Sequence, residues 1–423
     1  MPEVLPLKGI RFVQDRVGTF SKVITPPFDV ISPELRENLA QLSPFNMVHL
    51  ILPKEAAGKN RYESAASLFE EWKKAGVLCQ DEEESFYILE QTFRGLDGVE
   101  RTRTAIVARV RLPEKNVKRQ VLDHERTFPH KIEDRLQLMT ATKAQLEVVF
   151  LLYEDKKRRL HAFMNETKSR EPDVLAETAD GVRQRLWRTL ANPDVTEFFA
   201  DKTLYIADGH HRFRTAMTYR DLMRTEDNPG ETHPWDYALV ALVDCEDPGL
   251  VIWPTHRLVD PPDDFDVGDF FGRIRQNFEV QELPHDISPG TFMERIQHAP
   301  ACAIGLAIHS YGNYLLTLPE ERKTRVLGQN CPPLWADLDV VILHKGIIES
   351  VLGLPSGAEL LYEPDATKAL TMVAQNKKQI AFLVKAVTPN QVRICAEAGI
   401  YMPEKATYFF PKVPSGAVIY PLD

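Results

Sequence analysis

The side chains most able to do chemistry are concentrated in one stretch of five consecutive residues. It combines a carboxylate, a glycine, two imidazoles and a guanidinium: Asp208, Gly209, His210, His211 and Arg212. The apolar run 204–207 before it predicts a buried strand, and 215–223 after it predicts a helix. A strand, a glycine turn and a helix direct backbone N–H groups and the positive end of a helix dipole to one place, which suits an anion. The alternative is that Asp208 only caps the helix and the histidines lie on the surface.

A second polar cluster, His124 and Glu125, lies ahead of a predicted helix at 132–139. A carboxylate beside an imidazole is a pair used in general base catalysis and in metal binding. The cluster precedes the Asp208 stretch by one strand–helix–strand unit, which favours a functional role. The alternative is a capping Glu125 and a stacked His124.

Two further groups of residues are candidates for a site. Pro254 interrupts an apolar strand at 250–259 and leaves His256 and Arg257 at a strand terminus, where sites on sheet proteins tend to lie. Near the end of the chain, a proline-bracketed loop carries two lysines and a threonine that suit a phosphate, or that simply lie on the surface: Lys405, Thr407 and Lys412.

The composition excludes several classes of protein. The 423 residues have a net charge of −10 and no long basic run, so we expect no nucleic-acid partner. No apolar run is long enough to span a membrane, and the first twelve residues lack a signal pattern, so no membrane partner is expected either. Five scattered cysteines, an odd number, favour reduced thiols and a cytoplasmic protein.

The expected elements alternate between helices and strands, which predicts an α+β or mixed α/β fold. An apolar strand is expected at 46–52, and a long amphipathic helix at 338–348. A proline- and aspartate-rich linker at 261–265 indicates a boundary. We therefore expect three regions: 1–115, a core at 116–260 that contains the Asp208 stretch, and 261–423.

Several motifs of the chain occur in the order of a known family. They are Asp208–Arg212 after Tyr205-Ile206-Ala207, His124-Glu125 with Asp134-Arg135-Leu136, Pro254-Thr255-His256-Arg257, Leu338-Asp339-Val340 with Leu343-His344, and Met402-Pro403 with Thr407-Tyr408-Phe409. On these motifs, nearly the whole chain resembles the bacterial and archaeal family catalogued as domain of unknown function 1015. That resemblance implies no settled activity.

A wider resemblance covers about 121–222, which looks like the core shared by ParB, sulfiredoxin and ADP-dependent free serine kinases. It implies a ParB/sulfiredoxin-like central core, Glu125 as catalytic carboxylate with His124, and Asp208 as base or Mg²⁺ ligand. It also implies a phosphate cradle of four residues: Gly209, His210, His211 and Arg212. Arg135, His256 and Arg257 would bind or support the substrate. The chain differs from the kinase core in a long insertion at about 153–200. It differs from the domain of unknown function 1015 family in Arg214, where glutamate is usual, and in Ala406, where serine is common.

Together, the residues and the resemblance predict a phosphoryl-transfer enzyme. It would act on a small hydroxylated, serine-like metabolite, with ADP or ATP as cosubstrate and Mg²⁺ as cofactor. The same residues would serve a small-molecule phosphatase, with phosphoserine as a model substrate, and a non-catalytic nucleotide-binding switch is a further alternative. A metal-dependent hydrolase using His124, His210, His211 and His256 is a weaker one, because no pair has ligand spacing. A homodimer is compatible with the sequence.

Overall fold

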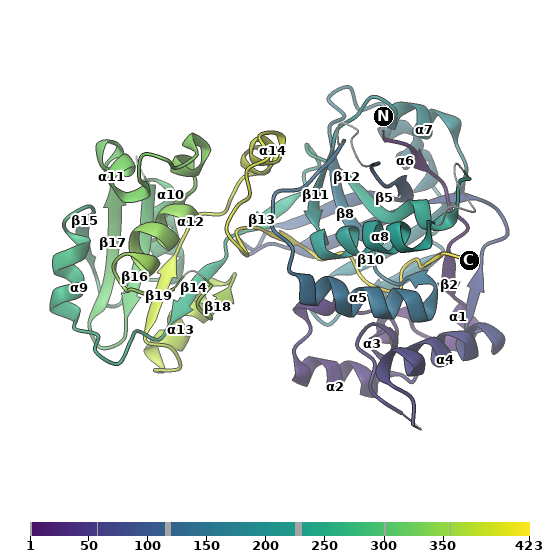
Figure 1. Ribbon diagram of the computed structural model, residues 1–423, viewed down its shortest axis with the longest axis horizontal. Coiled ribbons are helices and arrows are strands. Elements are labelled where there is room, and N and C mark those ends of the chain that lie inside the picture. Colours follow the sequence, from purple (N-terminus) through teal and green to yellow (C-terminus); the bar gives the residue numbers. More distant parts are fainter. Residues whose placement is uncertain (1, 57, 115–119, 225–230, 300–301, 356) are drawn as a thin grey trace. The chain divides into compact units, whose positions relative to one another are not determined.

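A computed structural model describes residues 2–56, 58–114, 120–224, 231–299, 302–355 and 357–423. The chain divides into two compact units (Figure 1). The first unit comprises 1–251 together with 411–423, and the second comprises 252–410. The chain therefore leaves the first unit, forms the second, and returns to the first for its last thirteen residues.

A large mixed sheet forms the centre of the first unit. Its strand order is β6-β11-β8-β12-β5-β4-β10-β9, and β1 pairs with β5. The strands are β1 (Val4–Leu5), β4 (Ser85–Arg94), β5 (Glu100–Arg111), β6 (Val121–Leu122), β8 (Val149–Tyr153), β9 (Val174–Glu177), β10 (Arg183–Leu190), β11 (Leu204–Asp208) and β12 (Tyr237–Asp244). Strand β11 runs parallel to β6 and antiparallel to β8, so the strand that carries Asp208 has a neighbour on each side.

Helices pack against this sheet and against one another. Helix α8 lies next to the sheet, α5 packs on α8, and α4 packs on α5 (Figure 1). The α-helices of the first unit are α1 (Gln14–Val17), α2 (Pro33–Leu42), α3 (Val48–Ile51), α4 (Arg61–Lys74), α5 (Pro129–Thr142), α6 (His161–Thr167), α7 (Pro193–Phe199) and α8 (His210–Met223). Short pairs β2 (Ile10–Phe12) with β3 (Leu78–Gln80), and β7 (Ala144–Gln145) with β21 (Tyr420–Pro421), complete it.

The second unit has an antiparallel sheet in the order β15-β17-β16-β19-β14-β18. These strands are β14 (His256–Val259), β15 (Glu279–Leu283), β16 (Cys302–Ile308), β17 (Gly312–Leu318), β18 (Leu361–Glu363) and β19 (Ile380–Leu383). Its helices are α9 (Val267–Ile274), α10 (Pro289–Gln297), α11 (Lys323–Leu327), α12 (Asp339–Ile342), a π-helix (Leu343–Glu349), α13 (Ala366–Ala374) and α14 (Pro389–Glu397). The pair β13 (Val251–Trp253) and β20 (Tyr408–Phe410) closes the unit.

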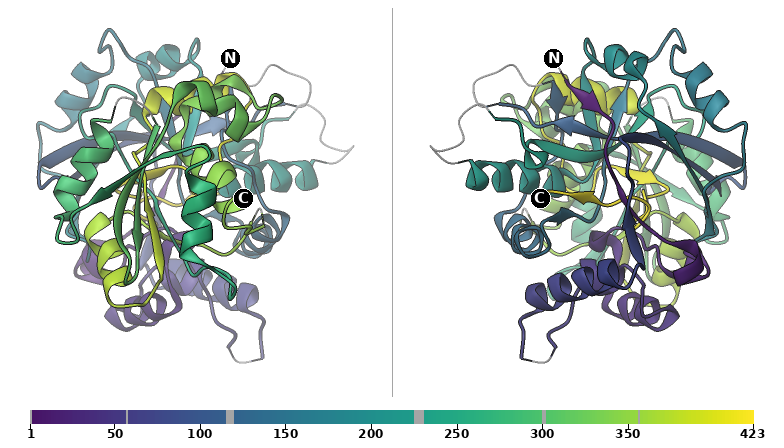
Figure 2. Two further views of the ribbon diagram at one scale, coloured as in Figure 1. Left: turned by 90° about the vertical axis from the view of Figure 1, so that its left-hand side faces the viewer. Right: turned by 90° about the vertical axis from the view of Figure 1, so that its right-hand side faces the viewer.

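Alternate residues of the central strands enter two separate cores in the second unit, because successive side chains of a strand point to opposite faces. Leu306 and Phe382 join the core that includes residues of α9 and the π-helix. Ala307 and Ala381 join the core that includes residues of α10 and α13. The sheet is thus covered on both faces, and the left-hand view of Figure 2 shows its strands between the helices.

The predicted mixed α/β fold is confirmed by these sheets and helices. The strand expected at 46–52 is wrong, since Val48–Ile51 is a helix, α3. The side chain of Asn46 accepts a hydrogen bond from the Val48 N–H at 3.0 Å and so favours a helical turn over a strand. The helix expected at 338–348 continues as α12 and the π-helix.

The boundary expected between 115 and 116 lies outside the described residues. The three-region division stays a prediction, because a core defined by motifs and a compact unit defined by contacts are different criteria. Within the described ranges, no helix is long and apolar enough to cross a membrane.

Candidate functional site

The turn after β11 has the predicted strand–glycine–helix geometry. Strand β11 is buried up to Ala207, and Gly209 then adopts a φ of +90° immediately before the fourteen-residue helix α8. A Cβ atom at position 209 would lie 3.0 Å from the Arg212 Cζ atom. The positive φ and this close approach both require glycine.

Asp208 lies partly buried between two cations in the turn. Its Oδ2 atom accepts a hydrogen bond from Arg212 at 2.5 Å, and its Oδ1 atom pairs with the Lys412 ammonium. Burial alone would raise the pKa of the Asp208 carboxyl, but Lys412 and Arg212 outweigh it and hold that pKa well below its usual range. Asp208 is therefore an ionised carboxylate whose immediate contacts carry two positive charges for its one negative charge.

Arg212 is anchored as well as paired. It is nearly fully buried, and its guanidinium also donates to the Val148 carbonyl oxygen. Burial would lower the pKa of Arg212, but Asp208 and Glu147 outweigh it and raise it, so the group stays charged. Arg212 therefore fixes the first turn of α8 against the start of β8.

A hollow of about 30 Å³ lies beside Arg212 and is lined also by Arg135 and Glu147. Arg135 donates to the Ile51 carbonyl at 2.7 Å and lies 3.6 Å from Glu147, and it stacks over the Phe28 ring. The hollow has room for a water molecule or two and not for a nucleotide. Arg135, Glu147 and Arg212 thus lie around the same small hollow next to the turn.

The His124–Glu125 cluster is fastened to α8 by the two histidines of the turn. The backbone N–H of His124 donates to Nε2 of His210 at 3.5 Å, which leaves the proton of His210 on Nδ1, 3.9 Å from Glu125 Oε2. The backbone N–H of Phe128 donates to Nε2 of His211 at 3.0 Å, and the two rings stack. The sequence-predicted Glu125 and Asp208 segments are therefore brought together.

Burial keeps two of these imidazoles neutral. It lowers the pKa of His124 to about 4. Burial, followed by the neighbouring His124, holds the pKa of His210 well below its usual range. The neutral ring of His210 can accept the hydrogen bond from the His124 backbone N–H, whereas an imidazolium has no acceptor nitrogen.

His256 and Arg257, which the sequence also placed in a site, belong to the second unit and interlock its parts. Nδ1 of His256 accepts a hydrogen bond from the Val384 N–H at 3.2 Å. Arg257 donates to His344 Nε2 at 3.2 Å, to the Lys405 carbonyl at 3.1 Å and to the Thr255 carbonyl. Burial lowers the pKa of His256 to about 3 and that of Arg257 to about 10.

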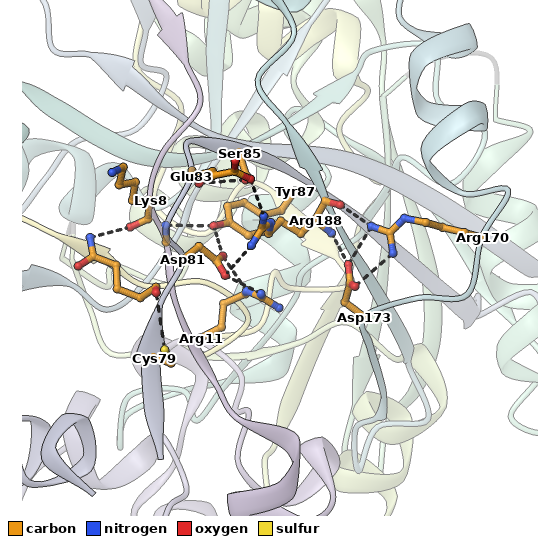
Figure 3. A network of polar contacts seen from close by, with 12 residues as sticks. Lys8, Arg11, Cys79, Asp81, Glu83, Ser85, Tyr87, Arg170, Asp173 and Arg188 are labelled. Carbon is orange, nitrogen blue, oxygen red and sulfur yellow. Dashed lines mark hydrogen bonds and ion pairs between the residues drawn. The ribbon is translucent and has the colours of Figure 1, made fainter. Parts of the chain in front are cut away.

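Another polar cluster of the first unit, centred on Asp81, was not predicted from the sequence (Figure 3). Asp81 accepts from Arg11 at 2.7 and 2.9 Å and from the Tyr87 hydroxyl at 2.6 Å, and Arg188 lies 3.3 Å away. Burial would raise the pKa of Asp81, but the hydrogen bonds from Arg11 and Tyr87 outweigh it and lower the pKa. Because these charges are paired within the protein, we interpret the cluster as structural: it links β2, β4 and β10 through Asp81, the residue that follows β3.

Three carboxylate or cation groups near the turn were not assigned to it from the sequence: Glu147, Arg103 and Lys412. Arg103 is almost fully buried and donates to the Pro411 carbonyl at 2.5 Å. Burial lowers its pKa to about 9, against the opposing effect of Asp247 and Asp208. Of these three, only Lys412 was a site candidate from the sequence, as one of the lysines of the C-terminal loop that suit a phosphate. The sequence did not predict that it pairs with Asp208.

The fold and the site define a class of protein: a mixed α/β protein with a partly buried, ion-paired carboxylate at a glycine turn that begins a helix. The sequence profile of the family described as protein of unknown function (DUF1015) matches residues 4–341. The chain belongs to this family, as its motifs predicted. No curated protein matches the chain.

Several solved structures are similar to the chain at low identity. A free serine kinase in complex with AMP has a TM-score of 0.34 and 14% identity over 69% of this chain and 83% of the kinase. A conserved hypothetical protein from Pyrococcus furiosus has a TM-score of 0.34 and 16% identity over 70% and 90% of the two chains. SbnI from Staphylococcus aureus, truncated at its C-terminus, has a TM-score of 0.34 and 11% identity over 72% and 84%. Scores this low carry no function over to this chain.

Proposed function

We propose that the chain transfers a phosphoryl group from a nucleotide, ADP or ATP, to the hydroxyl group of a small serine-like metabolite. The observation that carries the proposal is the turn itself, where a glycine-initiated helix meets Asp208, Arg212 and the Glu125 segment. The choice of a nucleotide and a serine-like metabolite as ligands is based on the resemblance of residues 121–222 to free serine kinases.

The terminal phosphates would lie at the first turn of α8. The residue before the helix is Gly209, which has no side chain to cap it, and the first backbone hydrogen bond of the helix joins the Phe213 N–H to the Gly209 carbonyl. The preceding N–H groups therefore suit phosphate oxygens, and the helix dipole favours their negative charge. In this proposal, His210 and His211 add to the cradle by holding the Glu125 segment beside it.

Glu125 would act as the general base, assisted by His124. The hydroxyl oxygen of the metabolite attacks the terminal phosphorus, the bond from that phosphorus to the bridging oxygen breaks, and the hydroxyl proton moves to Glu125. The Glu125 side chain is one-fifth exposed, at 20%, so a substrate can reach it, and the Nδ1 proton of His210 faces its carboxylate. Asp208 would orient the transferred group or bind the cofactor.

Mg²⁺ fits this site only together with a nucleotide. Within the residues that the structure describes, no group of three or more His, Cys, Asp or Glu side chains could hold a metal ion. Mg²⁺ commonly binds through one or two carboxylates and the phosphates of a substrate, and Asp208 could provide such a carboxylate. When bound, the ion would supply neutralisation of phosphate charge.

A transfer assay tests the proposal directly. The protein is incubated with ADP or ATP, with Mg²⁺, and with serine, threonine or glycerol, and the products are followed by ³¹P NMR. The proposal predicts a phosphate monoester that forms only with a hydroxylated acceptor. Release of inorganic phosphate from phosphoserine, with no transfer, would contradict it in favour of a phosphatase, and nucleotide binding without any turnover would favour a switch protein.

A further inference from the structure

We propose that Lys412 is a phosphate-binding residue that leaves Asp208 when a nucleoside polyphosphate binds, and so releases Asp208 for its role in the reaction. This inference rests on the proposed function and deepens it. It assigns a role to a residue that lies outside the motifs of the site and 204 positions from Asp208.

The backbone around Lys412 is fixed at the site, although its side chain is long and flexible. The Lys412 carbonyl accepts a hydrogen bond from Gln91 Nε2 at 3.0 Å, and the preceding Pro411 carbonyl accepts one from Arg103. Further along, Ser415 pairs with Thr25. The segment thus presents the Lys412 ammonium to the turn on a four-carbon stem from a held backbone.

Both carboxylate oxygens of Asp208 are already engaged by cations. Oδ2 accepts a hydrogen bond from Arg212, and Oδ1 pairs with the Lys412 ammonium. A substrate hydroxyl or a metal ion would compete with these contacts. Movement of one of the two cations would make an oxygen of Asp208 available to either ligand.

Lys412 is the cation that can move. Arg212 is held by the Val148 carbonyl and lies close to Gly209, where a Cβ atom would come within 3.0 Å of the guanidinium. A lysine ammonium is a compact charge with freely rotating donors, whereas a guanidinium is a rigid fork fixed by several partners.

The terminal phosphate of the nucleotide is the group to which the Lys412 ammonium would move. Phosphates at the N-terminus of α8 would lie next to Gly209, the residue that follows Asp208, within reach of the same ammonium. A phosphate that carries two negative charges competes with a single carboxylate for the lysine. Because the contact is to the β- or γ-phosphate, AMP should depend on Lys412 much less than ADP does.

The test compares ADP and AMP affinity by isothermal titration calorimetry in the full-length wild type and in three variants. Lys412→Met should weaken ADP binding by about tenfold or more, the usual effect of losing a charge-assisted hydrogen bond, and change AMP binding little. Lys412→Arg should retain most of the ADP affinity. Lys168→Met removes a comparable partly buried lysine, paired with Glu90 at 3.1 Å in the same unit, and should match the wild type.

The outcomes separate the two proposals. If the wild type binds no nucleotide, the proposed function fails and the role of Lys412 fails with it. If the wild type binds ADP but Lys412→Met binds it equally well, or loses ADP and AMP in equal proportion, only the inference about Lys412 is overturned. A fall in melting temperature without a change in the ADP-to-AMP affinity ratio would likewise show a purely structural lysine.

Discussion

Single residues decide which chemistry the turn can support. His210 and His211 use their Nε2 atoms to accept backbone N–H groups of the 124–128 segment. Their types suggested a phosphate cradle, and direct contact with phosphate stays a prediction. The contacts described here instead show how an imidazole can place a distant carboxylate, Glu125, beside the start of α8.

Replacement of Glu125 by glutamine separates binding from chemistry. Because the amide keeps the shape of the side chain but cannot take a proton, we expect Glu125→Gln to lower kcat by about 100-fold or more. Its ADP affinity, measured by calorimetry, should stay within a few-fold of the wild type. Glu133→Gln, on the exposed face of α5, is the control. An unchanged kcat in Glu125→Gln would remove Glu125 from the mechanism.

The lowered pKa of His124 predicts that the folded protein loses stability at acidic pH. Its folded pKa of about 4 lies below the ordinary value of 6.5, so the unfolded chain binds a proton that the folded one does not. The stabilisation is complete above pH 6.5 and is lost as the pH falls toward 4, at a cost of roughly 2–3 kcal/mol for this group.

The measurement is the melting temperature between pH 7 and pH 4.5. The decline should be shallower in His124→Gln than in the wild type, whereas His298→Gln, which alters an exposed histidine, should keep the wild-type slope. Equal slopes in all three proteins would show that His124 does not control this loss of stability.

At the scale of elements, local patterns predicted the site better than its long-range partners. The apolar run 204–207, the Asp-Gly turn and the following helix are confirmed as β11 and α8. Each of these three features depends on residues that are neighbours in the sequence, so the local sequence pattern is enough to predict it. At 46–52 the same reasoning was wrong, because a short apolar run does not distinguish a strand from a helix and the side chain of Asn46 decided the outcome.

The turn makes a sharp prediction about glycine. Gly209→Ala combines a positive φ with a Cβ atom 3.0 Å from the Arg212 guanidinium, so we expect a lower melting temperature and at least tenfold weaker ADP binding. Gly98→Ala has a similar φ of +75° but no atom within 4 Å of the new Cβ. It should cost about 1 kcal/mol through backbone strain alone and leave ADP binding intact. Equal binding by both variants would contradict the proposed phosphate position.

At the scale of the whole molecule, the second unit is built as an insertion. It holds two hydrophobic cores on the faces of its own sheet. Its first and last residues meet in the β13–β20 pair, where the Trp253 and Phe410 rings stack at 3.6 Å. The return of 411–423 to the first unit had no signal in composition, because it depends on contacts with residues hundreds of positions earlier, such as that of Lys412 with Asp208.

We expect a fragment of residues 252–410 to fold alone. Its cores are internal, and its ends are already adjacent, so excision breaks few of the contacts that stabilise it. Circular dichroism should show a cooperative melt. Phe382→Ala, which empties a fully buried position, should lower the melting temperature strongly, since such changes cost about 3–5 kcal/mol. A fragment without a cooperative transition would show that the second unit depends on the first.

The most direct test of the central claim, that the Asp208–Arg212 turn binds nucleotide phosphates, is a calorimetric titration of ADP with Mg²⁺ into the wild-type chain and Gly209→Ala. We expect the wild type to bind one ADP per chain and pyrophosphate to displace it. In Gly209→Ala the affinity for ADP should be at least tenfold lower. No heat of binding with ADP or ATP, or binding that Gly209→Ala leaves unchanged, would contradict this claim.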